Sequence, residues 1–115
     1  MKYIKDDEFI RGKSPMTKEE VRILSIAKLE TQQNSTLLDI GAGTGSVSIQ
    51  LCKCCPNGSV TAIEKNSEAI EILYKNKEKF EVSNLVVVEG EALGVERDID
   101  KIFDGIFIGG SGGNI

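Results

Sequence analysis

The sequence contains no histidine. This absence excludes histidine as a general base, as a metal ligand and as a side chain that changes charge near neutral pH. Three cysteines lie close together at Cys52, Cys54 and Cys55, but without a histidine or a second cysteine pair they make a poor zinc motif. We expect reduced, partly buried thiols at a helix end. Any chemistry therefore depends on carboxylates, lysines, hydroxyls, backbone groups or a cofactor.

Long apolar runs are also missing, and the N-terminal residues lack the apolar segment of a signal peptide. The 115 residues predict one domain, residues 1–115, with no membrane partner and a cytoplasmic location as the default. The net charge of −4 disfavours nucleic acid as a partner, because nucleic-acid binders usually carry a basic face. The composition is that of an ordinary globular domain, with 40% hydrophobic and 28% charged residues.

A glycine-rich stretch organises the chain. Residues 37–40 form an apolar run that contains Asp39, and glycines follow at Gly41, Gly43 and Gly45. This pattern predicts a strand, a tight turn and the start of a helix. A dinucleotide fingerprint needs G-x-G-x-x-G, and in either register the last glycine is replaced by serine. A phosphate-binding loop would need a lysine that is absent here. The stretch resembles the first motif of Rossmann-like S-adenosylmethionine (SAM) methyltransferases.

The three glycines suit such a cofactor because main chain without Cβ atoms can lie against its adenosine and methionine portions. Asp39 can reach the ammonium group of the cofactor, directly or through water. The plainer alternative is a strand-to-helix turn made of small residues. The candidate cofactor-binding residues of this stretch are Asp39, Gly41, Ala42, Gly43, Thr44 and Gly45.

Helical and extended patterns alternate along the chain. After an irregular arm over residues 1–16, anchored by Phe9 and Ile10, Thr17 and Glu20 have the form of a capping box. The expected helices cover residues 17–29, 46–54 and 66–80, and the expected strands cover residues 36–40, 59–63, 85–88 and 103–108. Asn66 or Ser67 can cap the third helix, and Ala69, Ile70, Leu73 and Tyr74 are expected to face inward. The alternation predicts an α/β fold with a parallel sheet and right-handed crossovers.

Acidic residues follow the strands of this sheet. Asp39, Glu64 and Glu89 fall at carboxyl ends, where ligands of parallel sheets bind, whereas Asp104 lies earlier in its strand. Glu64 can accept hydrogen bonds from both ribose hydroxyls of an adenosine, or it is simply a solvated acid before a helix. Ala92 follows the third strand and is small enough to let an adenine ring approach.

Three stretches, residues 7–22, 39–45 and 103–113, resemble the CbiT-type cobalt-precorrin-6B carbon-15 methyltransferases of cobalamin synthesis. The resemblance implies a Rossmann-like SAM methyltransferase fold with strand order 3-2-1-4. It also implies a tetrapyrrole substrate, transfer of a methyl group from SAM, and decarboxylation of an acetate side chain. By the family motifs, the cofactor contacts are Thr17, Gly41 to Gly45, Glu64 and Ala92.

Family members continue with three more strands, so we expect a sheet truncated before strands 5–7. The strand over residues 103–108 is then an exposed edge, which predicts self-association into a homo-oligomer. The glycine run over residues 109–113 is either an anion-binding nest for substrate carboxylates or a connector. The alternatives are a SAM methyltransferase acting on another small molecule or RNA, and a non-catalytic SAM-binding fragment. The incomplete glycine spacing disfavours an NAD-dependent oxidoreductase.

Overall fold

The computed structural model describes residues 2–13, 15–91 and 102–109; Ala92 and most of the glycine run lie outside these residues. The elements alternate as the sequence predicts, and they run as 3₁₀-helix η1 (Asp6–Glu8), α1 (Glu19–Leu29), β1 (Thr36–Ile40), α2 (Ser46–Cys54), β2 (Ser59–Glu64), α3 (Ser67–Lys79), β3 (Leu85–Glu89) and β4 (Gly105–Ile108). No helix in these residues is long and apolar enough to span a membrane.

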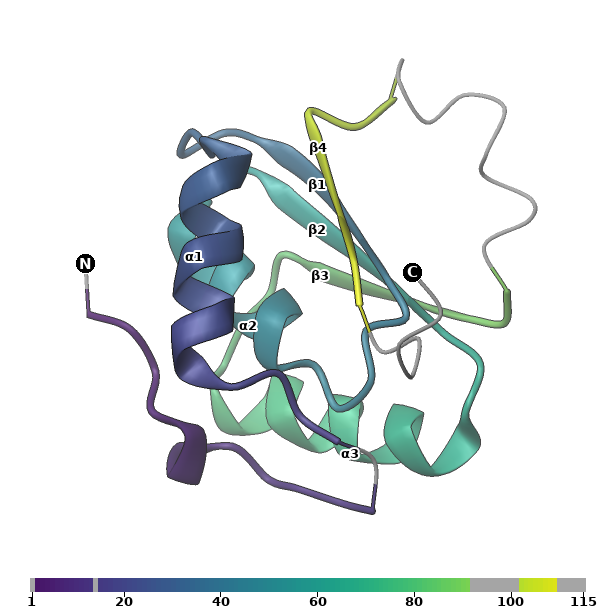
Figure 1. Ribbon diagram of the computed structural model, residues 1–115. Coiled ribbons are helices and arrows are strands. Elements are labelled where there is room, and N and C mark those ends of the chain that lie inside the picture. Colours follow the sequence, from purple (N-terminus) through teal and green to yellow (C-terminus); the bar gives the residue numbers. More distant parts are fainter. Residues whose placement is uncertain (1, 14, 92–101, 110–115) are drawn as a thin grey trace.

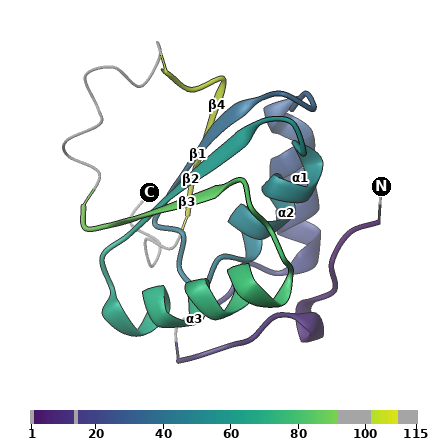
Figure 2. The ribbon, with the colours of Figure 1, turned by 180° about the vertical axis from the view of Figure 1, so that it is seen from behind.

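The four strands form one parallel sheet with the order β3-β2-β1-β4, as expected. In the register, Asp39 of β1 lies beside Ala62 of β2 on one side and Phe107 of β4 on the other. Helices α1, α2 and α3 lie on the same side of the sheet (Figure 1), and the view from behind agrees (Figure 2). Because the four strands are parallel, their carboxyl ends lie at one edge of the sheet, beside the turn between β1 and α2.

The core lies between α2 and the sheet. Ile49 and Leu51 of α2 are fully buried against Leu37, Val60 and Leu85 of the strands. Burial of each such side chain stabilises the fold by roughly 1.5–3 kcal/mol. Every residue of α2 except Lys53 is buried, because the helix is covered by the sheet on one side and by α1 and the N-terminal segment on the other.

The start of α1 differs from the prediction. Its N-cap is Lys18, whose side chain makes no capping hydrogen bond, so the predicted capping box at Thr17 is wrong. The reason is that the Thr17 carbonyl accepts a hydrogen bond from the guanidinium of Arg22 at 2.8 Å, which holds Thr17 outside the helix. The buried residues of α1 are Arg22 and Ile26, whereas Val21 lies on the exposed face.

Helix α3 follows the prediction at its start and departs from it later. The side chain of Asn66 accepts a hydrogen bond from the backbone N–H of Ala69 at 2.9 Å, which confirms the cap. The expected inward position of Tyr74 is wrong, because its side chain is 43% exposed. Asn76 is buried instead, since its amide finds partners on the N-terminal arm and on the glycine turn.

Strand β4 is shorter than the predicted segment. Asp104 precedes it and lies at the amino end of the sheet, where its backbone N–H donates to the Thr36 carbonyl and its carboxylate accepts from the Thr36 N–H. Asp104 therefore closes the edge opposite the site. Ile108 at the other end of the strand is 53% exposed, and the backbone N–H of Gly109 donates to the Ile40 carbonyl, so this amide is not part of a free anion nest.

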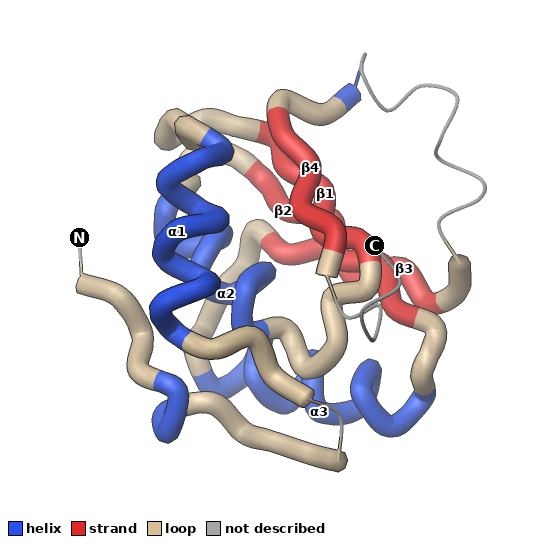
Figure 3. Tube along the Cα trace, in the orientation of Figure 1, coloured by secondary structure: helices blue, strands red, loops and turns tan. Residues whose placement is uncertain are grey.

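The N-terminal arm, residues 2–13 and 15–18, runs as loop and one short helical turn beside α1 and α3 before it reaches the start of α1 (Figure 3). Phe9 is its buried anchor, as expected, and its ring centroid lies 5.1 Å from that of Phe80. Polar contacts, which the sequence did not predict, supply the other anchors. The arm is therefore a packed part of the fold.

All three cysteines are buried and form no disulfide, and they are more fully buried than expected. Burial raises the pKa of Cys52 to about 12 and the pKa of Cys54 to about 11. Among the residues that the structure describes, no group of histidine, cysteine or carboxylate side chains could hold a metal ion. These thiols therefore belong to the core, because the thiolate needed for nucleophilic or redox chemistry is disfavoured.

Candidate cofactor site

The turn between β1 and α2 passes through three left-handed glycines. Gly41, Gly43 and Gly45 have φ angles of 73°, 60° and 94°, a region that other residues rarely adopt. A Cβ atom on Gly45 would also lie only 2.2 Å from a methyl group of Leu73. The backbone N–H groups of Gly41 and Ala42 both donate to the Ile63 carbonyl, which fixes the turn against β2. The alternating glycines thus allow the left-handed backbone conformation of the turn and its close packing against the rest of the fold.

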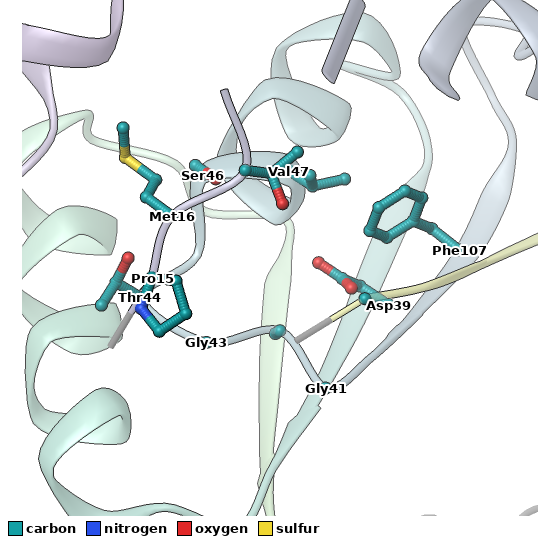
Figure 4. A pocket seen from close by; sticks show the side chains of 12 residues that line it. Pro15, Met16, Asp39, Gly41, Gly43, Thr44, Ser46, Val47 and Phe107 are labelled. Atoms are coloured by element: carbon teal, nitrogen blue, oxygen red, sulfur yellow. The ribbon is translucent and has the colours of Figure 1, made fainter. Parts of the chain in front are cut away.

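A cavity lies between this turn and the N-terminal arm (Figure 4). It is lined by Pro15, Met16, Thr17, Asp39, Gly41, Ala42, Gly43, Thr44, Ser46, Val47, Phe107 and Gly109. Six of the nine predicted site residues are among them. Gly45 and Glu64 lie outside the lining, and Ala92 lies outside the described residues. The structure thus brings Thr17 of the arm to the glycine turn, although 22 positions separate it from Asp39 in the sequence.

Asp39 is the charged group of this cavity, and only 1% of it is exposed. One carboxylate oxygen, Oδ2, accepts a hydrogen bond from the Ser48 hydroxyl, while Oδ1 is buried without a hydrogen-bond partner. Burial raises the pKa of Asp39 from 3.8 to about 7; the Ser48 bond lowers it and the nearby negative charge of Glu64 raises it further. A buried acceptor with an unused oxygen favours a cationic or hydrogen-bond-donating ligand.

Glu64 ends β2 beside the glycine turn and is engaged by backbone. Its Oε1 accepts from the N–H of Gly43 at 2.7 Å, and its Oε2 accepts from the N–H groups of Lys65 and Asn66. The carboxylate thus ties the glycine turn to the start of α3. It lies at the carboxyl edge of the sheet as predicted, with its oxygens held by three amides. Hydroxyl groups of a ligand would compete with these amides for the same oxygens.

Several residues of the site were missed from the sequence. Ser48 supplies the hydroxyl that orients Asp39, and its position nine residues later on α2 gave no separate signal. Phe107 gives the cavity an aromatic wall from β4. Asn76 and Arg22 are fully buried polar residues that fix the turn and the arm. A polar residue in the middle of an apolar helix face was the available signal for both.

Solved structures define the class of this fold. The chain superposes with a TM-score of 0.85 on precorrin-6y C5,15-methyltransferase from Geobacter metallireducens, with 41% identity over 97% of this chain and 59% of that one. It superposes with a TM-score of 0.80 on precorrin 8w decarboxylase from Methanobacterium thermoautotrophicum, with 36% identity over 96% of this chain and 59% of that one. The parallel sheet and its glycine turn are thus those of a Rossmann-like methyltransferase fold.

The particular family follows from sequence. The precorrin methyltransferase domain matches residues 8–114, and the chain belongs to this family. A curated relative from Salmonella typhimurium, cobalt-precorrin-6B C(15)-methyltransferase (decarboxylating), is 45% identical over 113 residues. The match covers 97% of this chain and 57% of the relative, so the chain spans little more than half the length of this relative.

Proposed function

We propose that this chain forms the SAM-binding part of an enzyme that methylates carbon 15 of cobalt-precorrin-6B and decarboxylates an acetate side chain. The name of the Salmonella relative supports the reaction and the tetrapyrrole substrate. One observation carries the cofactor assignment: the buried, unpaired Oδ1 of Asp39 borders a cavity beside a turn of left-handed glycines.

The residues present fit this cofactor. SAM carries an ammonium group and a sulfonium centre, and Asp39 offers a buried carboxylate oxygen that has no hydrogen-bond partner in the protein. The open space above Gly43, where an added Cβ would meet nothing within 4 Å, lets the backbone face a ligand. Glu64 would take the ribose hydroxyls by giving up part of its hydrogen bonding to backbone amides.

The other residues that line the cavity would orient the bound ligand and exclude water from it. When bound, SAM supplies an electrophilic methyl group on sulfur. Asp39 would hold the cationic end, and Thr17 would supply a hydroxyl from the arm. Met16, Val47 and Phe107 are large apolar side chains of the lining and would keep water away from a bound ligand. An electron-rich carbon of the macrocycle needs no strong base for attack, so positioning is the main contribution of this chain.

The proposal also includes the domain, the location, the partners and the self-association of this chain. Residues 1–115 form one SAM-binding domain with an N-terminal arm, located in the cytoplasm and acting without a nucleic-acid or membrane partner. The net charge of −4 supports a small-molecule acceptor over RNA. The exposed β4 residue Ile108 supports self-association through that edge of the sheet.

The test is calorimetric titration with S-adenosylhomocysteine, the demethylated product, with NAD as the control ligand. We expect saturable binding of S-adenosylhomocysteine and none of NAD. Glu64→Ala should weaken binding on the order of tenfold to a hundredfold, because each charge-assisted hydrogen bond contributes roughly 1.5–3 kcal/mol. Glu64→Gln is the matched control: it retains an acceptor for the Gly43 amide and removes the charge. Binding of NAD in place of S-adenosylhomocysteine would refute the assignment.

A second candidate is a SAM-binding protein that does not turn over alone. The observation in its favour is the 57% coverage of the Salmonella relative. Incubation of this chain with SAM and cobalt-precorrin-6B tests the second candidate, because methylated, decarboxylated product would mean that these residues catalyse the reaction by themselves. Binding of S-adenosylhomocysteine without product would support the second.

A further inference from the structure

The N-terminal arm supplies one wall of the cavity. Pro15 and Met16 lie beside the glycine turn (Figure 4), and Thr17 also lines the cavity. These residues precede α1, and the arm continues from them along the surface of α3. The cavity therefore has its described shape only while the arm is docked.

Asn76 binds the N-terminal arm and the glycine turn at once, through Ile10, which precedes the cavity-lining residues of the arm, and Thr44, which lines the cavity. Its amide nitrogen donates to the Ile10 carbonyl of the arm at 3.0 Å and to the Thr44 carbonyl of the glycine turn at 2.9 Å. Its amide oxygen accepts from the Ile10 N–H at 2.8 Å. The side chain is 0% exposed, so both of its N–H donors and its oxygen are used inside the protein.

Arg22 fixes the other part of the arm. Its fully buried guanidinium donates to the carbonyls of Ile4 and Thr17 and to the carboxylate of Asp6. It also lies over the Phe9 ring, 4.9 Å from the ring centroid. Thr17 also lines the cavity, so the hydrogen bond from Arg22 to the Thr17 carbonyl links the docked arm directly to the site.

We infer that Asn76 is a positioning residue that couples docking of the N-terminal arm to ligand binding at the glycine turn. One amide bridges the two segments that border the cavity, so loss of either partner leaves buried polar groups unsatisfied. A ligand that contacts both walls stabilises the docked arm, and by thermodynamic reciprocity the docked arm raises the affinity for that ligand by the same factor. This inference rests on the proposed cofactor site.

Limited proteolysis measures docking of the arm directly. Arg11 and Lys13 are exposed trypsin sites on the arm, and the N–H of Lys13 is held by the exposed carboxylate of Glu68 at 3.1 Å. We expect saturating S-adenosylhomocysteine to slow cleavage after Arg11 on the order of tenfold. Cleavage after Lys53 reports global unfolding and serves as the internal reference.

Two variants test the coupling. Asn76→Asp replaces the donor amide by an acceptor facing two carbonyls, and we expect weaker binding of S-adenosylhomocysteine and loss of arm protection. Glu68→Ala removes an exposed anchor without opening the core, so it should leave the melting temperature unchanged. It should speed cleavage after Arg11 by about threefold, and saturating ligand should slow this cleavage by the same factor as in the unaltered protein, because the coupling itself is retained. Lys75→Gln, an exposed change beside Asn76, is the matched control.

The outcomes are distinct. Loss of affinity together with loss of arm protection in Asn76→Asp supports the coupling. If that variant does not fold, faster cleavage of Glu68→Ala that saturating ligand slows by the same factor as in the unaltered protein supports it. Unchanged affinity in a folded Asn76→Asp variant whose arm has lost its protection overturns it, because a purely structural anchor behaves in that way. Ligand binding to the unaltered protein without protection of Arg11 also overturns the coupling and leaves the proposed function standing. Absence of S-adenosylhomocysteine binding refutes the proposed function and this inference together.

Discussion

Replacement of Asp39 by asparagine should change how the stability of this protein depends on pH. Burial raises the pKa of the Asp39 carboxyl from 3.8 to about 7 in the folded protein. Between these values the folded state keeps a proton that the unfolded state has lost, so the free energy of unfolding falls as pH rises. Below the lower value and above the upper one, Asp39 contributes no slope. In the Asp39→Asn variant this contribution is absent at every pH.

The size of the effect follows from the shift. At 1.36 kcal/mol per pKa unit, the full change corresponds to up to about 4 kcal/mol. Between about pH 5 and about pH 8, the Asp39→Asn variant should therefore gain about 3 kcal/mol of stability relative to the unaltered protein. A constant offset is expected in addition, because Ser48 still has an acceptor while the new amide nitrogen lacks a partner.

Urea titrations at several pH values give these free energies. Asp7→Asn is the control, since it removes an exposed carboxyl from the arm. The free energy of unfolding of Asp7→Asn should follow that of the unaltered protein across the pH range. Parallel pH profiles for the unaltered protein and Asp39→Asn would refute the reasoning, because they would mean that Asp39 ionises alike in the folded and unfolded states.

Three further predictions concern ligand binding, packing and assembly. If Asp39 holds the ammonium group of S-adenosylhomocysteine, binding near pH 6 should release up to one proton, measured by calorimetry in buffers of different ionisation enthalpy; identical observed heats in all of these buffers contradict this. Gly45→Ala should lower the free energy of unfolding by roughly 1–3 kcal/mol in urea titrations, because the added Cβ meets Leu73 at 2.2 Å and φ is 94°; unchanged stability contradicts it. Ile108→Lys should reduce self-association measured by light scattering, whereas a monomer at high concentration before substitution would contradict an associating β4 edge.

Local patterns were sufficient to predict the elements and much of the site. The glycine spacing after Asp39 indicated a strand, a turn and a helix, and the structure has β1 and α2 in those places. The rule that parallel strands end at one edge then placed Asp39 and Glu64 together. Thr17 was assigned two functions, and only the one at the cavity is compatible with the structure.

The errors have a common physical origin. The Thr17 cap and the inward position of Tyr74 were predicted from neighbours within one helix. In both cases contacts with the N-terminal arm decided otherwise. Arg22, which binds Ile4 and Asp6 of the arm, also takes the Thr17 carbonyl, and Asn76 is buried because it binds Ile10 of the arm. Such contacts have no sequence period, because each depends on which segments meet after the chain folds.

The sequence by itself determined the strand–turn–helix at Asp39, the parallel sheet and the family, because these depend on local spacing and on motifs. Tertiary structure alone decided that Asp39 is buried with one oxygen unpaired, that Glu64 is bound to the glycine turn, and that the arm forms a wall of the cavity. Burial and hydrogen-bond satisfaction are properties of the assembled packing, since they depend on every segment that excludes water from the group. A sequence pattern specifies a carboxylate, and the fold sets its pKa and its partners.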